Sequence, residues 1–180
     1  VLTVSSRGSC AHSWDADDWS MQSASFACPA GASALAADDR GTRVALGGRK
    51  GAVAVRSSTD ATLAWCVDDA HIDRVDAVAF SPNGDVLAST SSADGYLYVW
   101  RAVDGNQLWR AVGGSEGVAF AGDGLLVTST GVYRARDGTK LVPLEGTGPV
   151  AASADGRFAF VGVEADEGLL WYVPGLVAGQ

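Results

Sequence analysis

The chain has 180 residues, of which 47% are hydrophobic, and a formal net charge of −8 at pH 7. It is long enough to bury a sizeable core, and its scattered acidic residues without a basic stripe argue against nucleic-acid binding. No apolar run reaches the roughly 18 residues of a membrane-spanning helix, so no membrane partner is expected.

The beginning of the chain predicts two short strands, over residues 1–4 and 10–14. Four glycine turns, 43, 40 and 32 residues apart, then divide the rest of the chain. Each turn lies between two apolar segments, which predicts antiparallel hairpins. Third strands are predicted after each hairpin, and fourth strands after the first three hairpins. The turns are Arg40-Gly41, Asn83-Gly84, Asp123-Gly124 and Asp155-Gly156.

Residues 71–100 are the most informative stretch. Alternating apolar residues precede one turn, an apolar run follows it, and a third strand rich in aromatic residues ends at Trp100. Such residues favour a packed, pleated strand. The order of motifs closely resembles the tryptophan-aspartate (WD) repeat family. These motifs are His71, Ser81-Pro82-Asn83-Gly84, Leu87-Ala88-Ser89, Asp94-Gly95 and Trp100.

This resemblance implies an all-β fold, a β-propeller of four-stranded antiparallel blades. A repeat spacing near 40 residues suits such blades, and about four to five are present, as part of a larger, seven-bladed ring. A compact five-bladed ring is the alternative. We expect one propeller domain or fragment, completed by the remainder of its own propeller or by a second copy. The predicted blades cover residues 1–28 (partial), 29–68, 69–112, 113–146 and 147–180.

In WD repeats, a His, a Ser or Thr, an Asp and the Trp form a hydrogen-bonded chain. The resemblance places this structural tetrad at His71, Ser89, Asp94 and Trp100, with Ser91 as the alternative serine. The segment from Leu87 to Trp100 is one residue longer than usual, which suggests a bulge near Ser91-Ser92. The same residue types could form a catalytic triad, but their positions in the repeat favour the structural role.

Two other blades lack the tryptophan. Arg56 and Tyr133 take its place, so packing alone is expected to stabilise those blades. Cys10, Cys28 and Cys66 show no paired-ligand spacing and are interpreted as buried free thiols of a reducing, cytoplasmic compartment. Neither a metal nor a cofactor is predicted, and the acidic turns lack the pattern of a calcium loop.

WD propellers mostly act as rigid platforms for proteins, so we expect a non-catalytic scaffold that binds protein or peptide partners. The alternative is a quinoprotein-like enzyme or cofactor-binding domain, because residues 104–109, echoed by 60–65, are similar to quinoprotein repeats. The basic cluster Arg40, Arg43, Arg49 and Lys50 is interpreted as solvent-exposed charge of turns and strand edges, and not as a nucleic-acid-binding patch.

The predicted partner-binding face carries the loop before each first strand and the turn between second and third strands. It comprises Arg49, Lys50, Asp69, Ile72, Asp73, Arg74, Ser115, Glu116, Glu164, Asp166 and Glu167.

Overall fold

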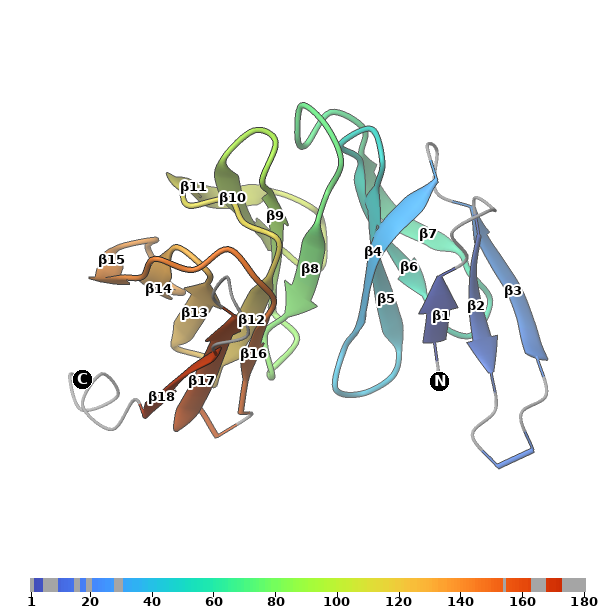
Figure 1. Ribbon diagram of the computed structural model, residues 1–180. Coiled ribbons are helices and arrows are strands. Elements are labelled where there is room, and N and C mark those ends of the chain that lie inside the picture. The colour runs from blue at the N-terminus through green and yellow to red at the C-terminus, as the bar shows by residue number, and fades with distance from the viewer. Residues whose placement is uncertain are drawn as a thin grey trace.

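A computed structural model of the chain describes residues 2–4, 10–14, 17–18, 21–27, 31–153, 155–162 and 168–172. Within these ranges the chain forms strands and turns, with no helix. The strands make five antiparallel sheets, and in each sheet the strands follow one another in chain order (Figure 1). The predicted fold class, an all-β propeller of four-stranded antiparallel blades, is confirmed.

We number the sheets as blades 1 to 5. Blade 1 contains β1 (Leu2–Val4), β2 (Cys10–Trp14) and β3 (Met21–Ala27). Blade 2 contains β4 (Ala32–Ala37), β5 (Arg43–Gly48), β6 (Val53–Ser57) and β7 (Leu63–Val67). Blade 3 contains β8 (Ala77–Phe80), β9 (Val86–Ser91), β10 (Tyr96–Arg101) and β11 (Gln107–Val112). Blade 4 contains β12 (Val118–Ala121), β13 (Leu125–Thr128), β14 (Gly131–Arg134) and β15 (Lys140–Pro143), and blade 5 contains β16 (Val150–Ala152), β17 (Phe158–Gly162) and β18 (Gly168–Tyr172).

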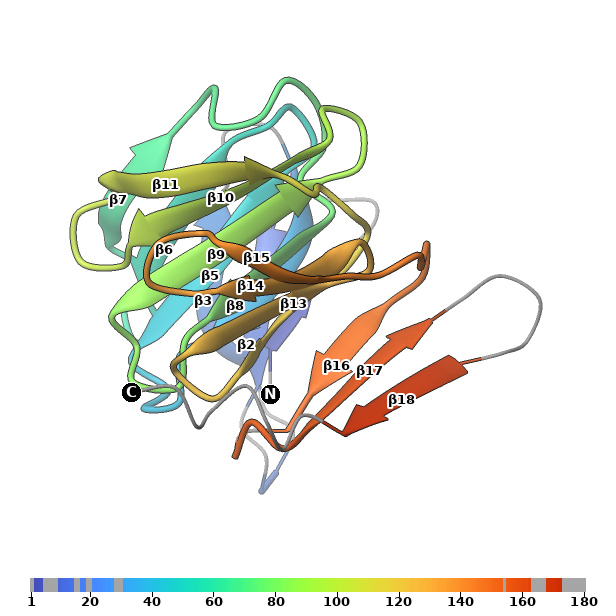
Figure 2. The same cartoon turned by 90° about the vertical axis from the view of Figure 1, so that its left-hand side faces the viewer.

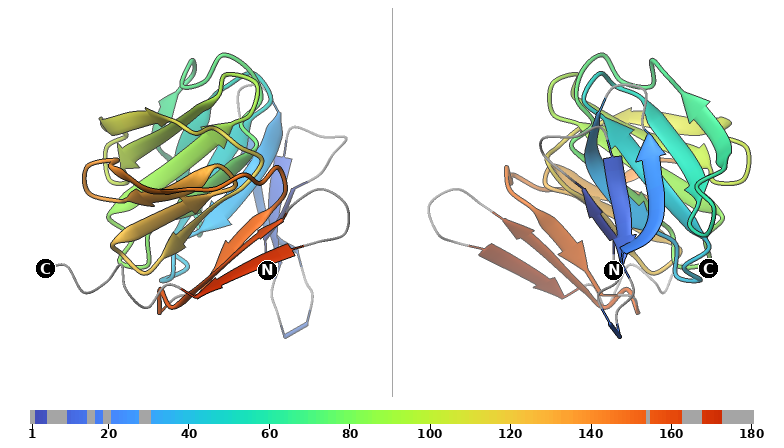
Figure 3. Two further views of the ribbon diagram at one scale, coloured as in Figure 1. Left: turned by 60° about the vertical axis from the view of Figure 1, so that its left-hand side comes forward. Right: turned by 90° about the vertical axis from the view of Figure 1, so that its right-hand side faces the viewer.

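The blades pack face to face. Their first strands are neighbours, because β4 contacts β8, β8 contacts β12 and β12 contacts β16. Figures 2 and 3 show the blades following one another along an arc, with blades 1 and 5 at its ends. Side chains alternate between the two faces of a strand, so each inner blade buries one apolar face against each neighbour. In blade 3, Leu87 and Trp100 pack toward blade 2, whereas Ala88 and Leu97 pack toward blade 4.

The extra residue between Leu87 and Trp100 lies in the β9–β10 turn. β9 and β10 pair without interruption from Ser91 opposite Tyr96 to Val86 opposite Arg101. The bulge suggested near Ser91-Ser92 is therefore wrong, because the four-residue turn with Gly95 at φ 74° accommodates the insertion. An irregularity does occur in this blade, but between β10 and β11, at Val99/Trp100.

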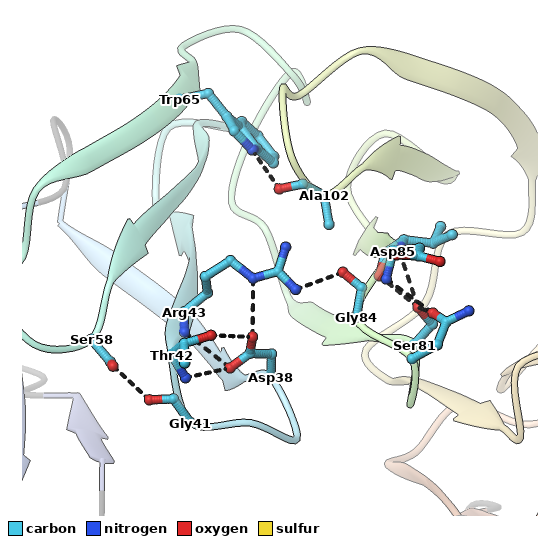
Figure 4. A network of polar contacts seen from close by, with 12 residues as sticks. Asp38, Gly41, Thr42, Arg43, Ser58, Trp65, Ser81, Gly84, Asp85 and Ala102 are labelled. Carbon is cyan, nitrogen blue, oxygen red and sulfur yellow. Dashed lines mark hydrogen bonds and ion pairs between the residues drawn. The ribbon is translucent and has the colours of Figure 1, made fainter.

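Two tryptophans on outer strands form contacts between blades, one from blade 2 to blade 3 and one from blade 3 to blade 4. Trp65 on β7 donates from Nε1 to the carbonyl oxygen of Ala102 at 3.0 Å (Figure 4). Trp109 on β11 donates to Ala135 in blade 4 at 2.8 Å. The tryptophans that end the two segments similar to quinoprotein repeats, Trp65 and Trp109, therefore pack between blades.

The blades without a tetrad tryptophan also use polar contacts. The Tyr133 hydroxyl, in blade 4, donates to the carbonyl oxygen of Val112 at 3.0 Å. Arg56, in blade 2, donates from Nη1 to Ala61 at 2.9 Å. The expectation that packing alone stabilises these blades is wrong, since both side chains reach backbone carbonyls.

Candidate partner-binding site

The structure brings the four predicted tetrad residues into one hydrogen-bonded chain. His71 Nδ1 lies 2.8 Å from Asp94 Oδ2, and His71 Nε2 lies 2.9 Å from Ser89 Oγ. Trp100 Nε1 donates to the same Ser89 oxygen at 2.9 Å. Ser89 can therefore accept from the indole and donate to the imidazole, while His71 donates to Asp94. Ser91, the alternative serine, is buried, and its hydroxyl has no hydrogen-bond partner in the part of the chain that the structure describes.

This chain of side chains is closed to solvent. The side chains of His71 and Asp94 are 0% and 1% exposed, and Ser89 is 0% exposed. The His71 ring packs edge-on against Tyr98, and Tyr98 stacks on Trp100. Burial lowers the pKa of His71 below its ordinary value of 6.5, against the opposing effect of Asp94, so the imidazole is neutral at neutral pH. Because no substrate can reach the serine oxygen, the geometry fits a structural clasp and not a hydrolytic triad.

The clasp fixes the loop between β7 and β8. Asp94 Oδ2 also accepts from the backbone N–H of Ile72 at 3.2 Å. The His71 N–H donates to the carbonyl oxygen of Gly51, in the β5–β6 turn, at 3.0 Å. Gly51 has φ 87°, and a Cβ there would meet the His71 carbonyl oxygen at 1.9 Å, so this close approach requires glycine. These hydrogen bonds thus hold together the β5–β6 turn, the β7–β8 loop and the β9–β10 turn at one end of the propeller.

Side chains on these connections project outward. Ile72 is 86% exposed, the highest exposed fraction among the large hydrophobic side chains of the described residues. Most of the predicted partner-binding face is exposed with it, namely Arg49, Lys50, Asp69, Asp73, Arg74 and Glu116. Glu164, Asp166 and Glu167 lie outside the described residues.

Ser115 differs from the prediction. It is only 4% exposed, and its hydroxyl donates to the carbonyl oxygen of Gly117 at 2.7 Å. Its own carbonyl oxygen accepts from Thr90 at 2.8 Å. Ser115 therefore holds the β11–β12 connection in place and does not present a side chain to a partner.

A recess of about 470 Å³ lies between the β7–β8 loop, the β9–β10 turn and the β11–β12 connection, and its lining begins at Asp73, the residue that follows Ile72. Asp76 holds its shape by accepting from both the N–H and the hydroxyl of Ser92 at 2.7 Å. Arg74 pairs with Asp76 at 3.2 Å, while Asp73 and Glu116 also line the recess. The lining contains three carboxylates and one guanidinium and is therefore negatively charged, so the recess favours a cationic group. Sequence reasoning did not select Asp76 and Ser92, although both flank the loops that it placed on this face.

Among the residues described, no three His, Cys, Asp or Glu side chains are grouped to hold a metal ion, and no helix has the length and apolarity to cross a membrane. Cys66 is only partly buried, and its Sγ donates to Asp68 Oδ1 at 3.3 Å, so the expectation of a buried thiol is wrong there, because β7 is an outer strand. Cys28 and the side chain of Cys10 lie outside the described part.

The stacked antiparallel blades define a β-propeller, and the His–Ser–Asp–Trp chain of blade 3 resembles that of a WD repeat. Residues 64–101, which cover most of β7 in blade 2 and then β8, β9 and β10 of blade 3, match the family model described as WD domain, G-beta repeat. This match confirms the WD-repeat resemblance predicted for this stretch. No curated protein matches the chain.

Solved structures extend the comparison to the whole arc. A chain in the "Crystal Structure of Mitotic Checkpoint Complex" is 21% identical with a TM-score of 0.78, and the match covers 96% of this chain and 58% of that one. The computationally designed Ika4 protein is 20% identical with a TM-score of 0.66, with 81% and 93% covered. The designed Ika8 protein is 18% identical with a TM-score of 0.70, with 96% and 58% covered. The chain thus spans little more than half of the checkpoint-complex chain, and these similarities show the propeller fold.

Proposed function

We propose that this propeller is a non-catalytic scaffold that binds a protein or peptide partner through the loops around Ile72. The WD-repeat fold is typical of protein-interaction scaffolds and is generally non-catalytic. One observation carries the proposal for this chain: Ile72 is 86% exposed, yet its backbone N–H is fixed by Asp94. A solvent-facing aliphatic side chain on a fixed backbone loses little backbone entropy when a partner covers it.

The chemistry around Ile72 indicates what the partner presents. An apolar side chain would pack on Ile72, and a Lys or Arg would enter the recess lined by Asp73, Asp76 and Glu116. An apolar anchor beside charged groups that guide orientation is the usual composition of a protein interface. A cytoplasmic location stays a prediction.

A random peptide library displayed on phage tests this proposal. Among the peptides selected on the wild-type protein, one group should carry a basic residue next to an apolar one. Peptides of this group should bind Ile72→Asp at least about tenfold more weakly, because a carboxylate replaces the apolar anchor. Asp73→Asn and Glu116→Gln should each weaken binding by a few-fold and reduce its salt dependence.

Val103→Asp is the matched control. Val103 is also an exposed aliphatic residue, at 71%, but it lies in the turn after β10, at the opposite end of blade 3. Peptides that bind the loop face should bind this variant as they bind the wild-type protein. A selection in which every binder ignores Ile72→Asp would overturn the proposed function.

A further inference from the structure

A second groove lies at the other end of blades 2 and 3. It has a volume of about 540 Å³ and is lined by the β4–β5 and β8–β9 hairpins and by residues at the β10–β11 turn. Because adjacent strands are antiparallel, these turns lie opposite to the loop that carries Ile72. The groove is therefore separate from the proposed partner-binding face.

A guanidinium in the wall of this groove is held at two points. Arg43 Nε donates to Asp38 Oδ2 at 3.0 Å, and Arg43 Nη2 donates to the carbonyl oxygen of Gly84 at 2.7 Å. Its carbon lies 5.2 Å from the centre of the Phe80 ring. Figure 4 shows the other terminal nitrogen pointing away from Asp38 and Gly84, toward the segment that carries Ala102. Arg43 thus keeps N–H donors for a further acceptor in a fixed orientation.

The anchor of Arg43 is itself rigid. Asp38 is 4% exposed and accepts from the Thr42 N–H at 2.7 Å and from the Thr42 hydroxyl at 2.9 Å. Burial raises the pKa of Asp38, but the hydrogen bonds from Arg43 and Thr42 outweigh it and lower the pKa. The carboxylate therefore stays charged and keeps the guanidinium in place.

Two more arginines line the groove. Arg40 is exposed, and no hydrogen bond or ion pair of its side chain is found among the described residues. Arg101 pairs with Asp104 at 3.0 Å, but both side chains are exposed, and such pairs are weak. Asp85 is the carboxylate in the groove wall. The residues that line the groove thus include three arginines and one carboxylate, so its lining is cationic in a chain with a net charge of −8, although Asp38 and Asp104 each pair with one of the arginines.

Apolar side chains lie next to these cations. Val103 is 71% exposed and Leu108 is 44% exposed, and both line the same groove. A small inorganic anion would leave these two side chains uncovered. A polyanion such as nucleic acid would also bring phosphates against Asp85 without using the apolar surface. A peptide that has a carboxylate beside a large apolar side chain matches both features.

We propose that this groove binds an extended peptide segment of a protein partner in which an Asp or Glu side chain neighbours a large apolar one. The carboxylate accepts from the remaining N–H groups of Arg43 and from Arg40. The apolar side chain packs on Val103 and Leu108. The propeller then has two binding faces, basic ligands being taken near Ile72 and acidic ones at the opposite end.

Fluorescence anisotropy with labelled peptides tests the groove directly. The probe is a short peptide of alternating Glu and Leu with flanking Gly and Ser, and two control peptides carry Gln for Glu or Ser for Leu. The wild-type protein should bind the probe at least about tenfold more tightly than either control peptide, and added salt should weaken only the probe with Glu. Arg40→Glu and Leu108→Asp should each weaken probe binding about fivefold or more.

Two variants separate this groove from other surfaces. Arg136→Glu removes a cation that is 84% exposed outside the groove, and Ile72→Asp alters the loop face. Both should bind the probe with wild-type affinity. The proposal is overturned if the wild-type protein does not bind the probe, if the Gln peptide binds equally well, or if Ile72→Asp and not Leu108→Asp abolishes binding. The first two outcomes leave the function proposed for the loop face intact.

Discussion

The indole N–H of Trp65 donates to the carbonyl oxygen of Ala102, 3.0 Å away in the next blade. The ring also covers Gly105, where a Cβ would lie 2.6 Å from ring carbons. Blade 3 repeats the arrangement toward blade 4, since Trp109 donates to Ala135 and covers Gly138. The contact is therefore a repeated device that sets the spacing between blades.

Gly105→Ala should destabilise the protein more than Gly95→Ala. Both glycines have a positive φ, of 73° and 74°, so both substitutions strain the backbone to a similar degree. Only the alanine at residue 105 would also collide with the Trp65 ring, because nothing lies within 4 Å of a Cβ at Gly95. We expect an additional loss of about 1–3 kcal/mol, the cost of overpacking, in urea unfolding followed by fluorescence. Equal losses for the two variants would show that the ring contact is unimportant.

Much of blade 3 could be predicted because its signals are local. The turn glycines, the alternating apolar residues and the Asp94-Gly95 turn all lie within 30 residues or so of chain, which suits the spacing of one repeat. The choice between Ser89 and Ser91 could not be made this way. It depends on whether the extra residue enters a strand or a turn, and the structure places it in the β9–β10 turn.

Features that join two blades were harder to foresee. Arg43 donates to Gly84, which is 41 residues away in the sequence. No local sequence pattern therefore predicts the fixed orientation of Arg43 or the groove beside it. The position of Ser115 in the connection before a first strand predicts that its side chain is exposed. Its burial results from hydrogen bonds with Thr90 and Gly117, which only the packed structure reveals.

Ser89→Ala should cost about 1–3 kcal/mol of unfolding free energy. The substitution leaves both His71 Nε2 and the Trp100 indole N–H buried without a partner, and unpaired buried polar groups carry this penalty. Ser91→Ala is the control, on the same strand and equally buried, but its hydroxyl has no hydrogen-bond partner in the described structure. Its stability should equal or exceed that of the wild-type protein. If thermal unfolding ranks the two variants the other way round, Ser89 is not the centre of the clasp.

Stability should fall as the pH is lowered from 7 toward 5. Burial holds the pKa of His71 below 6.5, so the unfolded chain takes up a proton near pH 6.5 while the folded chain does not. Proton uptake by the unfolded state lowers the free energy of unfolding as pH decreases, until the folded-state pKa is reached. Thermal unfolding of His71→Gln should be less sensitive to pH in this window. The chain has a second histidine, and His12→Gln should keep the wild-type dependence; the reverse result would assign the effect to His12.

Asp38→Asn should destabilise the junction of blades 2 and 3. Asp38 is 4% exposed and accepts from the Arg43 guanidinium, which in turn holds Gly84 of the next hairpin. An amide would place an N–H donor where only acceptors are tolerated and would leave Arg43 without its counterion, so we expect a loss of about 1–3 kcal/mol. Asp39→Asn, at the exposed neighbouring position, should change stability by no more than about 0.5 kcal/mol. The wild-type contribution should also decline in acid: it starts to fall below the ordinary pKa of 3.8 and is lost as the pH passes through the lowered pKa of Asp38, because the charged form stabilises the folded state. Urea titrations of both variants at pH 7 and pH 3 check this, and equal stabilities of Asp38→Asn and Asp39→Asn at pH 7 would show that the Asp38–Arg43 pair does not link the two blades.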